Sequence, residues 1–312
     1  MSTQPGPLQI ESILLPLDGS SRAELALPAV ALLAGHLDAR VQLLHIVEHE
    51  APASVHGERH LATAQDATAY LRAIAARLME EGISVSIHVH DDPERDITQS
   101  IAVHATELDA DLVVLVAHGA GGWRNFVFGR VAQQVALHGS RPAIVLQDRR
   151  EGTMAPFPPA KIAVLLDGPA DIEGEAALPA TMTLARAFNA SVRLITSIPS
   201  AELSSDRGPV ATLLPSATRA LSQMEQDAAV RYLEERVHHL RDAGIEATAV
   251  VLRGEPIDEV LPEAKRSGAD MLAIVTHPRS PLSGMLSGSV AARALTSWGG
   301  ALLIVRSPEE TR

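Results

Sequence analysis

Short apolar runs alternate with longer amphipathic or alanine-rich segments along the first half of the chain. The runs have the length of strands, and the segments between them have the spacing of helices. The polar stretch HVHDDPERD (88–96) is predicted to be a solvated loop. The pattern predicts strands over 12–17, 40–47, 83–89, 111–116 and 143–147, and helices over 21–37, 61–81, 94–107 and 130–138.

The second half repeats this pattern. SILLPLDGS (12–20) is echoed by IAVLLDGP (162–169), and DADLVVLVAHGAGG (109–122) by GADMLAIVTHPRSP (268–281). The sequence therefore predicts a duplication, with domains at 1–150 and 158–312 and a linker inside DRREGTMAPFPPA (148–160). In the second half we expect strands over 161–166, 191–198, 245–252, 270–276 and 301–305, and helices over 173–188, 216–243, 256–267 and 289–297.

Continuous β-branched strands that alternate with helices are typical of parallel sheets covered on both faces. Each half is therefore predicted to be a doubly wound α/β domain of five strands, Rossmann-like in type. Such sheets bind ligands beyond the carboxyl ends of their strands. The Asp-Gly turn after the first strand and the Gly-rich turn after the fourth both lie at that end.

Composition narrows the classes of function. The net charge of −12 argues against a nucleic-acid surface, and the absence of cysteine excludes disulfides, thiolate metal sites and thiol nucleophiles. The N-terminus MSTQPGPLQIES lacks the basic and apolar regions of a secretory signal. No apolar run approaches the roughly 18 residues that cross a membrane. We therefore expect a cytoplasmic protein with no nucleic-acid or membrane partner.

Candidate phosphate-binding residues lie in AHGAGGWRNFVFGR (117–130), where Gly119 and Gly129 permit close backbone approach. Arg130 is predicted at a helix N-terminus, where it could clamp a phosphate or pair with an internal carboxylate. In the second half, Gly288 and Ser289 open a helix and could hold an anion. A tight connection without a ligand explains the same glycines.

Two aspartates follow the first strand of each half. Asp18 and Asp167 could accept hydrogen bonds from a nucleoside, or could simply form an Asx turn or cap the next helix. His88 and His90 share a face of a predicted edge strand and could chelate a metal. Outward-facing polar residues on an edge strand explain that pair more simply.

The segments ILLPLDGS, LLHIVE and DLVVLVAHG…FGRVAQQV…RPAIVLQ, with their second-half copies, resemble the universal stress protein family over nearly the whole chain. The resemblance implies a strand order of 3-2-1-4-5 and association as dimers. It also implies an adenine-nucleotide site in the branch that carries G-x2-G-x9-G-[S/T]. The site residues it implies are Pro16, Asp18, Ile46, Gly119, Gly129, Arg130 and Val131 in the first half, and Asp167, Ser197, Gly288, Ser289 and Val290 in the second.

Both copies of the phosphate motif depart from the family pattern. In the first half, Val116 replaces the first Gly and Arg130 the hydroxyl residue. In the second half, Val275 and Pro278 replace the first two glycines. Each Val adds a side chain where a phosphate would approach, and Pro278 also removes a backbone donor.

The resemblance also predicts an intramolecular pseudo-dimer that pairs AIVLQ (143–147) with LLIVR (302–306) and protects both edges. Further association to a homodimer is plausible by symmetry. We expect a stress-response regulator that binds ATP in at least one domain. The alternative is a nucleotide-free module that binds proteins. No catalytic constellation emerges, so we expect no enzyme, with weak ATP hydrolysis as the third possibility.

Overall fold

A computed structural model describes most of the chain in two compact units. The first consists of Leu8–Pro158 with Gly299–Arg306, and the second is built on Pro159–Trp298. The fifth strand of the second half therefore groups with the first unit. The structure describes residues 6–48, 54–55, 58–59, 61, 63–118, 128–150, 153–169, 172–198, 215–276 and 290–307.

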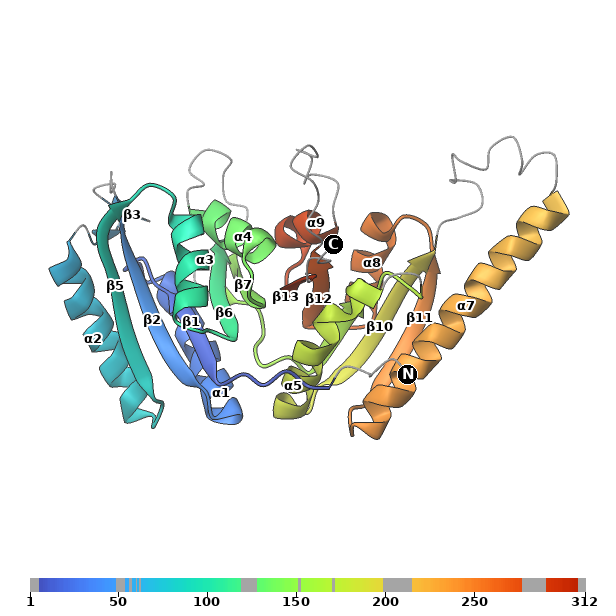
Figure 1. The fold of residues 1–312 in the computed structure, drawn as a ribbon, viewed down its shortest axis with the longest axis horizontal. Helices are drawn as coiled ribbons and strands as arrows, with labels where there is room; N and C mark the ends of the chain where they lie inside the picture. Colours follow the sequence, from blue (N-terminus) through green and yellow to red (C-terminus); the bar gives the residue numbers. More distant parts are fainter. Residues whose placement is uncertain are drawn as a thin grey trace. The chain divides into compact units, whose positions relative to one another are not determined.

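The first unit holds a parallel sheet in the order β5-β2-β1-β6-β7 (Figure 1). Numbered along the repeat, this is 3-2-1-4-5, so the predicted strand order is confirmed for this half. Consecutive strand residues such as Leu43 and Leu44 are both fully buried, which requires cover on both faces. The strands are β1 (Ser12–Pro16), β2 (Arg40–Glu48), β5 (Val85–Glu94), β6 (Leu112–His118) and β7 (Ala143–Arg150).

Helices cover this sheet. The first turn after β1 is a 3-10 helix, η1 (Ala23–Ala26), which leads directly into α1 (Leu27–Leu37). Helix α2 packs on β5 and β2, while α3 and α4 pack together and α4 contacts β6 and β7. The remaining bounds are α2 (Ala64–Glu80), α3 (Ile97–Glu107) and α4 (Phe128–His138).

The edge of this sheet differs from the sequence prediction. Strand β5 continues to Glu94, so the solvated loop predicted over 88–96 is wrong for most of its length. The helix predicted from residue 94 begins at Ile97. The Asp96 carboxylate accepts a hydrogen bond from the Gln99 N–H (3.0 Å), which fixes the N-terminus of α3 three residues later than expected.

The second unit repeats the parallel arrangement in the order β11-β10-β9-β12. These strands are β9 (Lys161–Leu165), β10 (Ser191–Ile198), β11 (Ala247–Arg253) and β12 (Met271–Thr276). The order is 3-2-1-4, as in the first half. The helical elements are η2 (Ile172–Ala177), α5 (Leu178–Phe188), α7 (Pro215–Asp242), α8 (Pro256–Arg266) and α9 (Val290–Ser297).

Strand β13 (Ala301–Arg306) pairs antiparallel with β7 in the first unit, with Leu302 opposite Val145 and Ile304 opposite Ala143. The predicted pairing of the two last strands is therefore confirmed. Within the predicted linker, the two-residue strand β8 (Thr153–Met154) also pairs with β7. A separate pair joins β3 (Ser54–Val55) and β4 (Glu58–Arg59).

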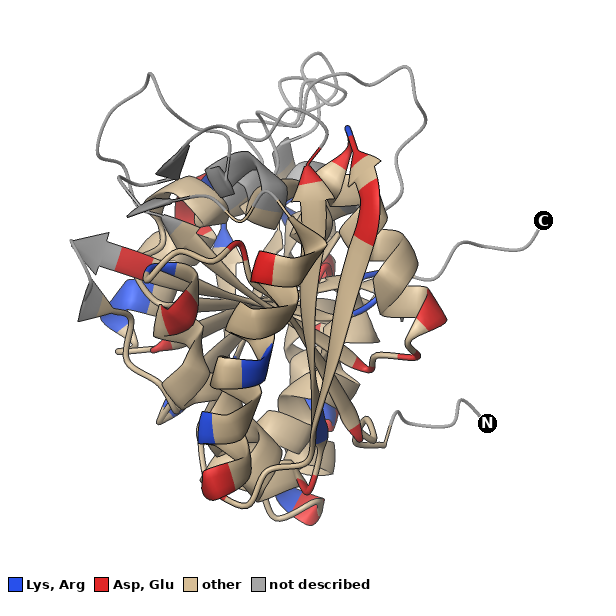
Figure 2. Ribbon diagram, turned by 90° about the vertical axis from the view of Figure 1, so that its left-hand side faces the viewer, with Lys and Arg blue, Asp and Glu red and all other residues tan. Residues whose placement is uncertain are grey.

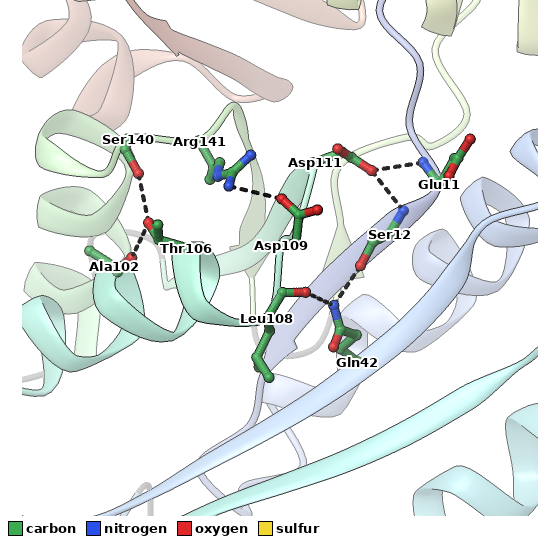
Figure 3. Close-up of polar contacts among 10 residues, drawn as sticks. All are labelled: Glu11, Ser12, Gln42, Ala102, Thr106, Leu108, Asp109, Asp111, Ser140 and Arg141. Atoms are coloured by element: carbon green, nitrogen blue, oxygen red, sulfur yellow. Dashed lines mark hydrogen bonds and ion pairs between the residues drawn. The ribbon is translucent and has the colours of Figure 1, made fainter.

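A carboxylate holds the start of the first strand in each half. Asp111 accepts hydrogen bonds from the N–H groups of Glu11 (2.9 Å) and Ser12 (3.0 Å), as Figure 3 shows. Asp270, its counterpart in the repeat, accepts from the two residues at the start of β9, at 3.0 and 3.2 Å. The duplication has thus kept this contact as well as the strand order.

Acidic residues gather at one end of the first unit's edge strand. The last residues of β5 include Asp91, Asp92 and Glu94, and Figure 2 shows acidic positions at that end of the sheet. Among the described helices, none is both long and apolar enough to cross a membrane.

Candidate functional site

The turn after β1 is built around Asp18. Its Oδ1 accepts hydrogen bonds from the Ser20 N–H (2.9 Å) and from Ser20 Oγ (2.7 Å). Ser20 Oγ in turn accepts from the N–H of Ala23, the first residue of η1, at 3.2 Å. Gly19 has φ +90°, a conformation that favours glycine. The Asx-turn role weighed for Asp18 is therefore present, and it fixes the direction of the carboxylate.

Three predicted site residues come together here. Pro16, Asp18 and Ile46 all line one cavity at the carboxyl ends of β1 and β2. This is the end of a doubly wound sheet where ligands bind. Most of the remaining wall is apolar, with side chains of α3, β6 and α4: Ile97, Ile101, Leu115, Val116 and Ala132.

The cavity is small and open to solvent. Its volume is about 80 Å³, below the roughly 300–1,000 Å³ of typical ligand pockets. Val116, which stands where the family motif has Gly, is one of the residues that line it. A nucleoside would place only part of its surface inside unless the apolar walls moved apart.

The charge inside the cavity is acidic. Glu48 at the end of β2 joins Asp18 in the lining, and burial, followed by the charge of Asp18, raises the pKa of the Glu48 carboxyl. His45 also contributes; its Nδ1 donates to the Leu17 carbonyl (2.8 Å). None of the described residues that line the cavity is Lys or Arg. The cavity therefore suits the uncharged part of a ligand rather than its phosphates.

The predicted phosphate residues of the first half are only partly described. Gly119 lies outside the described residues. Gly129, Arg130 and Val131 fall within the first four residues of α4, which begins at Phe128, two residues earlier than expected; their side chains are outside the description. Ala132, the next residue, lines the cavity. The N-terminal end of α4 therefore lies beside the site, as a phosphate-binding helix would.

Of the site residues predicted in the second half, Asp167, Ser197 and Val290 are described. Asp167 is exposed after β9, and Ser197 Oγ donates to the Gly254 carbonyl (2.7 Å), so its hydroxyl already has a partner. Val290 is the half-buried first residue of α9. Gly288 and Ser289 lie outside the described residues.

The histidines of β5 lie close to His104 of α3. The rings of His90 and His104 meet edge to face, with centroids 5.0 Å apart. Burial, and then the charge of His104, lowers the pKa of His88. No group of three potential metal ligands occurs within the part of the chain that the structure describes.

Several residues that line the cavity were not predicted from the sequence. Ile97 and Ile101 share a face of α3 at i, i+4 spacing, a signal that also fits ordinary core packing. Glu48 is more distinctive, because it is a charged residue that ends a buried apolar strand on the ligand side of the sheet. Ala132 could have been found from its position just after the motif.

The two parallel sheets, the first with a cavity at the carboxyl ends of its strands, define a tandem, doubly wound α/β protein. A model of the universal stress protein family matches residues 9–147 and again 160–306. The two matches cover most of the chain and one falls in each half. The chain therefore belongs to the universal stress protein family, in tandem form.

Solved structures agree with this fold. A functionally unknown protein from Pseudomonas aeruginosa PAO1 is 19% identical, with a TM-score of 0.68 over 96% of this chain and 93% of its own. A universal stress protein from Archaeoglobus fulgidus DSM 4304 is 14% identical, with a TM-score of 0.67 over 96% and 99%.

A shorter match is a universal stress protein from Archaeoglobus fulgidus in complex with dAMP. It is 22% identical, with a TM-score of 0.33 over 44% of this chain and 98% of its own. Among curated proteins the search found no significant match.

Proposed function

We propose that this chain is a stress-response regulator that binds an adenine nucleotide, ATP, in the cavity of its first unit. The observation that carries the proposal is the convergence of Pro16, Asp18 and Ile46 on one cavity at the carboxyl ends of β1 and β2. The apolar walls suit a base, and the Asp18 carboxylate suits hydroxyl or amino donors of a nucleoside.

The phosphates would lie outside the acidic part of the cavity, toward α4. A helix N-terminus offers unpaired N–H groups and a partial positive charge, both of which favour an anion. Because Ala132 lines the cavity, a base held there would bring its phosphates within reach of that end of α4. Gly129 and Arg130 belong to the first turn of α4, so the phosphates would meet their backbone N–H groups.

A second function has its own support. Val116 lines the cavity where the ATP-binding branch of the family has Gly, and the cavity is smaller than a nucleoside needs. Both features favour a nucleotide-free protein that acts through its surface. Weak ATP hydrolysis is a third possibility, which release of ADP during binding would reveal.

Matched variants in the two halves test the proposal. Ala132 is 3% exposed, and its repeat counterpart Ala291 is 6% exposed at the matching place in α9. Ala132→Leu would fill the first-unit cavity, whereas Ala291→Leu adds the same volume to the second half. We would release small molecules from each freshly purified protein and identify them by mass spectrometry.

The proposal expects an adenine nucleotide from the wild type and from Ala291→Leu, but none from Ala132→Leu. Loss in Ala291→Leu alone would move the site to the second half. If no protein carries a nucleotide and none binds ATP, the nucleotide-free function replaces the proposal. Circular dichroism of both variants checks that the added side chains leave the fold intact.

A further inference from the structure

The first unit has a second, larger concavity, which we call the α1 groove. Its volume is about 830 Å³, within the range of roughly 300–1,000 Å³ that is typical of ligand pockets. It shares no lining residue with the cavity beside Asp18. The groove is lined by residues of α1, of α2 and of the segment that follows β7, among them Pro28, Leu32, Gly35, Ile74, Glu81 and Phe157.

Helix α1 is strongly apolar for a helix that borders an open groove. None of its residues from Leu27 to Leu37 is Asp, Glu, Lys or Arg. Its exposed positions include Pro28, Leu32 and Gly35. A helix that is apolar on nearly every side is normally buried. The outer face of α1 is therefore suited to contact with an apolar molecule.

The duplication supplies an internal comparison for this face. Helices α1 and α5 both begin with Leu-Pro, have the same length and end at a residue with left-handed φ, so their positions correspond one to one. Leu32 corresponds to Thr183, and Gly35 corresponds to Arg186. The second half thus has polar side chains at two positions where the first half has an apolar or no side chain.

The Arg186 side chain links α5 to the end of α7. Its Nε and Nη2 donate to the Ala243 carbonyl at 3.1 and 3.0 Å. In the first half the place of Ala243 is taken by Glu81, which directly follows α2 and lines the groove. Gly35 has no side chain that could reach it, and a Cβ added there would meet no atom of the described residues within 4 Å. The gap that an arginine spans in the second half is therefore open in the first.

A second position differs in the same direction. Ile74 of α2 lines the groove, and its counterpart in α7 is Arg236, whose Nε and Nη2 both lie 2.8 Å from Glu175 Oε1. The counterpart of Glu175 in the first half is Glu24, which pairs with Arg77 at 3.0 Å. The first half therefore has an apolar residue in the groove where the second half has a paired arginine.

The end of the groove near Gly35 favours a positive charge. Gly35 lies in the last turn of α1, and α2 ends just before Glu81. The C-terminus of a helix carries a partial negative charge, to which Glu81 adds a carboxylate. The basic residues that line the groove already have partners: Arg77 pairs with Glu24, and His36 Nδ1 lies 2.9 Å from a carbonyl oxygen of its own helix.

We infer that the α1 groove binds an aliphatic cation, that is, a small molecule with an apolar chain and one ammonium or guanidinium group. The second half indicates the chemistry that fits, because the alkyl stem and guanidinium of Arg186 occupy the matching place there. The chain would lie against Pro28 and Leu32, and the cationic group would reach Glu81 at the end of α2. This site is separate from the cavity beside Asp18, so the inference does not depend on the proposed function.

The probe is hexylguanidinium, titrated by calorimetry into the full chain. Hexanol has the same chain without a charge, and hexanoate has the same chain length with a negative charge. We expect hexylguanidinium to bind, hexanol to bind more weakly by about tenfold or more, and hexanoate not to bind. Equal binding of the three would overturn the inference, because the groove would then select only the chain. Absence of binding by hexylguanidinium would also overturn it.

Three variants locate the site. Gly35→Arg gives the first half the arginine of the second, and its side chain should fill the groove and weaken binding of hexylguanidinium by about tenfold or more. Glu81→Ala should weaken it about threefold. Glu80→Ala, one residue earlier and outside the lining of the groove, is the matched control and should bind like the wild type. Unchanged affinity in Gly35→Arg, or the same loss in both glutamate variants, would overturn the inference.

A second measurement covers the case in which Gly35→Arg fails to fold. The amide chemical shifts of the wild type locate the bound probe without any variant. Shift changes at Gly35 and Glu81 on addition of hexylguanidinium support the inference, and changes confined to residues outside the groove contradict it. ATP, titrated separately, reports on the cavity beside Asp18, so the failure of one site is distinguishable from the failure of the other.

Discussion

Removal of the Asp111 carboxylate tests how the first strand is held at the start of the sheet. The carboxylate accepts two backbone N–H groups, from Glu11 and Ser12, at 2.9 and 3.0 Å. A hydrogen bond to a charged group contributes about 1.5–3 kcal/mol. The bond from the Glu11 N–H is exposed to solvent and the bond from the Ser12 N–H is partly buried. We therefore expect Asp111→Ala to lower the free energy of unfolding by roughly 2 kcal/mol.

The control is Asp109, a nearby aspartate whose side chain is largely exposed. Asp109 pairs with Arg141 at 3.2 Å, but its side chain is 82% exposed, and such surface pairs contribute about 0–1 kcal/mol. Its φ of 48° is one that Asn tolerates, so Asp109→Asn removes the charge without straining the backbone.

Urea unfolding followed by circular dichroism gives the free energies, and hydrogen exchange reports on the Ser12 amide itself. We expect a large loss of stability and of Ser12 protection in Asp111→Ala only. Similar small effects in both variants would refute the reasoning. Asp270→Ala repeats the test at the start of β9, where the same contact occurs.

Two further predictions concern stability. Gly19→Ala should destabilise the protein by about 1–2 kcal/mol, because φ is +90° and the new Cβ would lie 2.6 Å from the Leu61 side chain. Gly35→Ala, in open space on α1, should instead stabilise the protein by about 0.5–1 kcal/mol. Urea unfolding measures both variants, and the reverse order of stability would contradict both predictions. The folded state lowers the pKa of His88, so stability should fall as the pH drops below about 6.5, where the unfolded chain binds the proton more readily. Thermal unfolding between pH 5 and 8 should show a smaller loss for His88→Gln than for the exposed control His238→Gln, and identical profiles would contradict the assignment.

Much of the fold could be predicted from the sequence because its signals are local and repeated. Buried parallel strands appear as continuous apolar runs, and the duplication fixed the order of elements twice. The pairing of β7 with β13 was implied by the family resemblance, and it also gives an edge strand a partner. The extension of β5 to Glu94 could not be predicted, because Asp, Pro and Glu disfavour strands. The pairing with β2 shifts register after His90 and resumes at Glu94, opposite Glu48.

The candidate site was predictable only in part. Asp18 is recognisable from the Asp-Gly-Ser turn, and Ile46 from its place near the end of a strand. Glu48, Ile97 and Ala132 come from three different elements, and only the packing of α3 and α4 on the sheet brings them to one cavity. The hydrophobic periodicity of a single helix or strand cannot predict that side chains from different elements will line the same cavity.

The most direct test of the central claim is a calorimetric titration of ATP into the full chain, after any co-purified ligand has been removed. The account predicts one site per chain with micromolar affinity, lost in Ala132→Leu and kept in Ala291→Leu. Absence of heat at millimolar ATP, confirmed by equilibrium dialysis, would contradict it. The cavity beside Asp18 would then be a feature of the fold without a nucleotide.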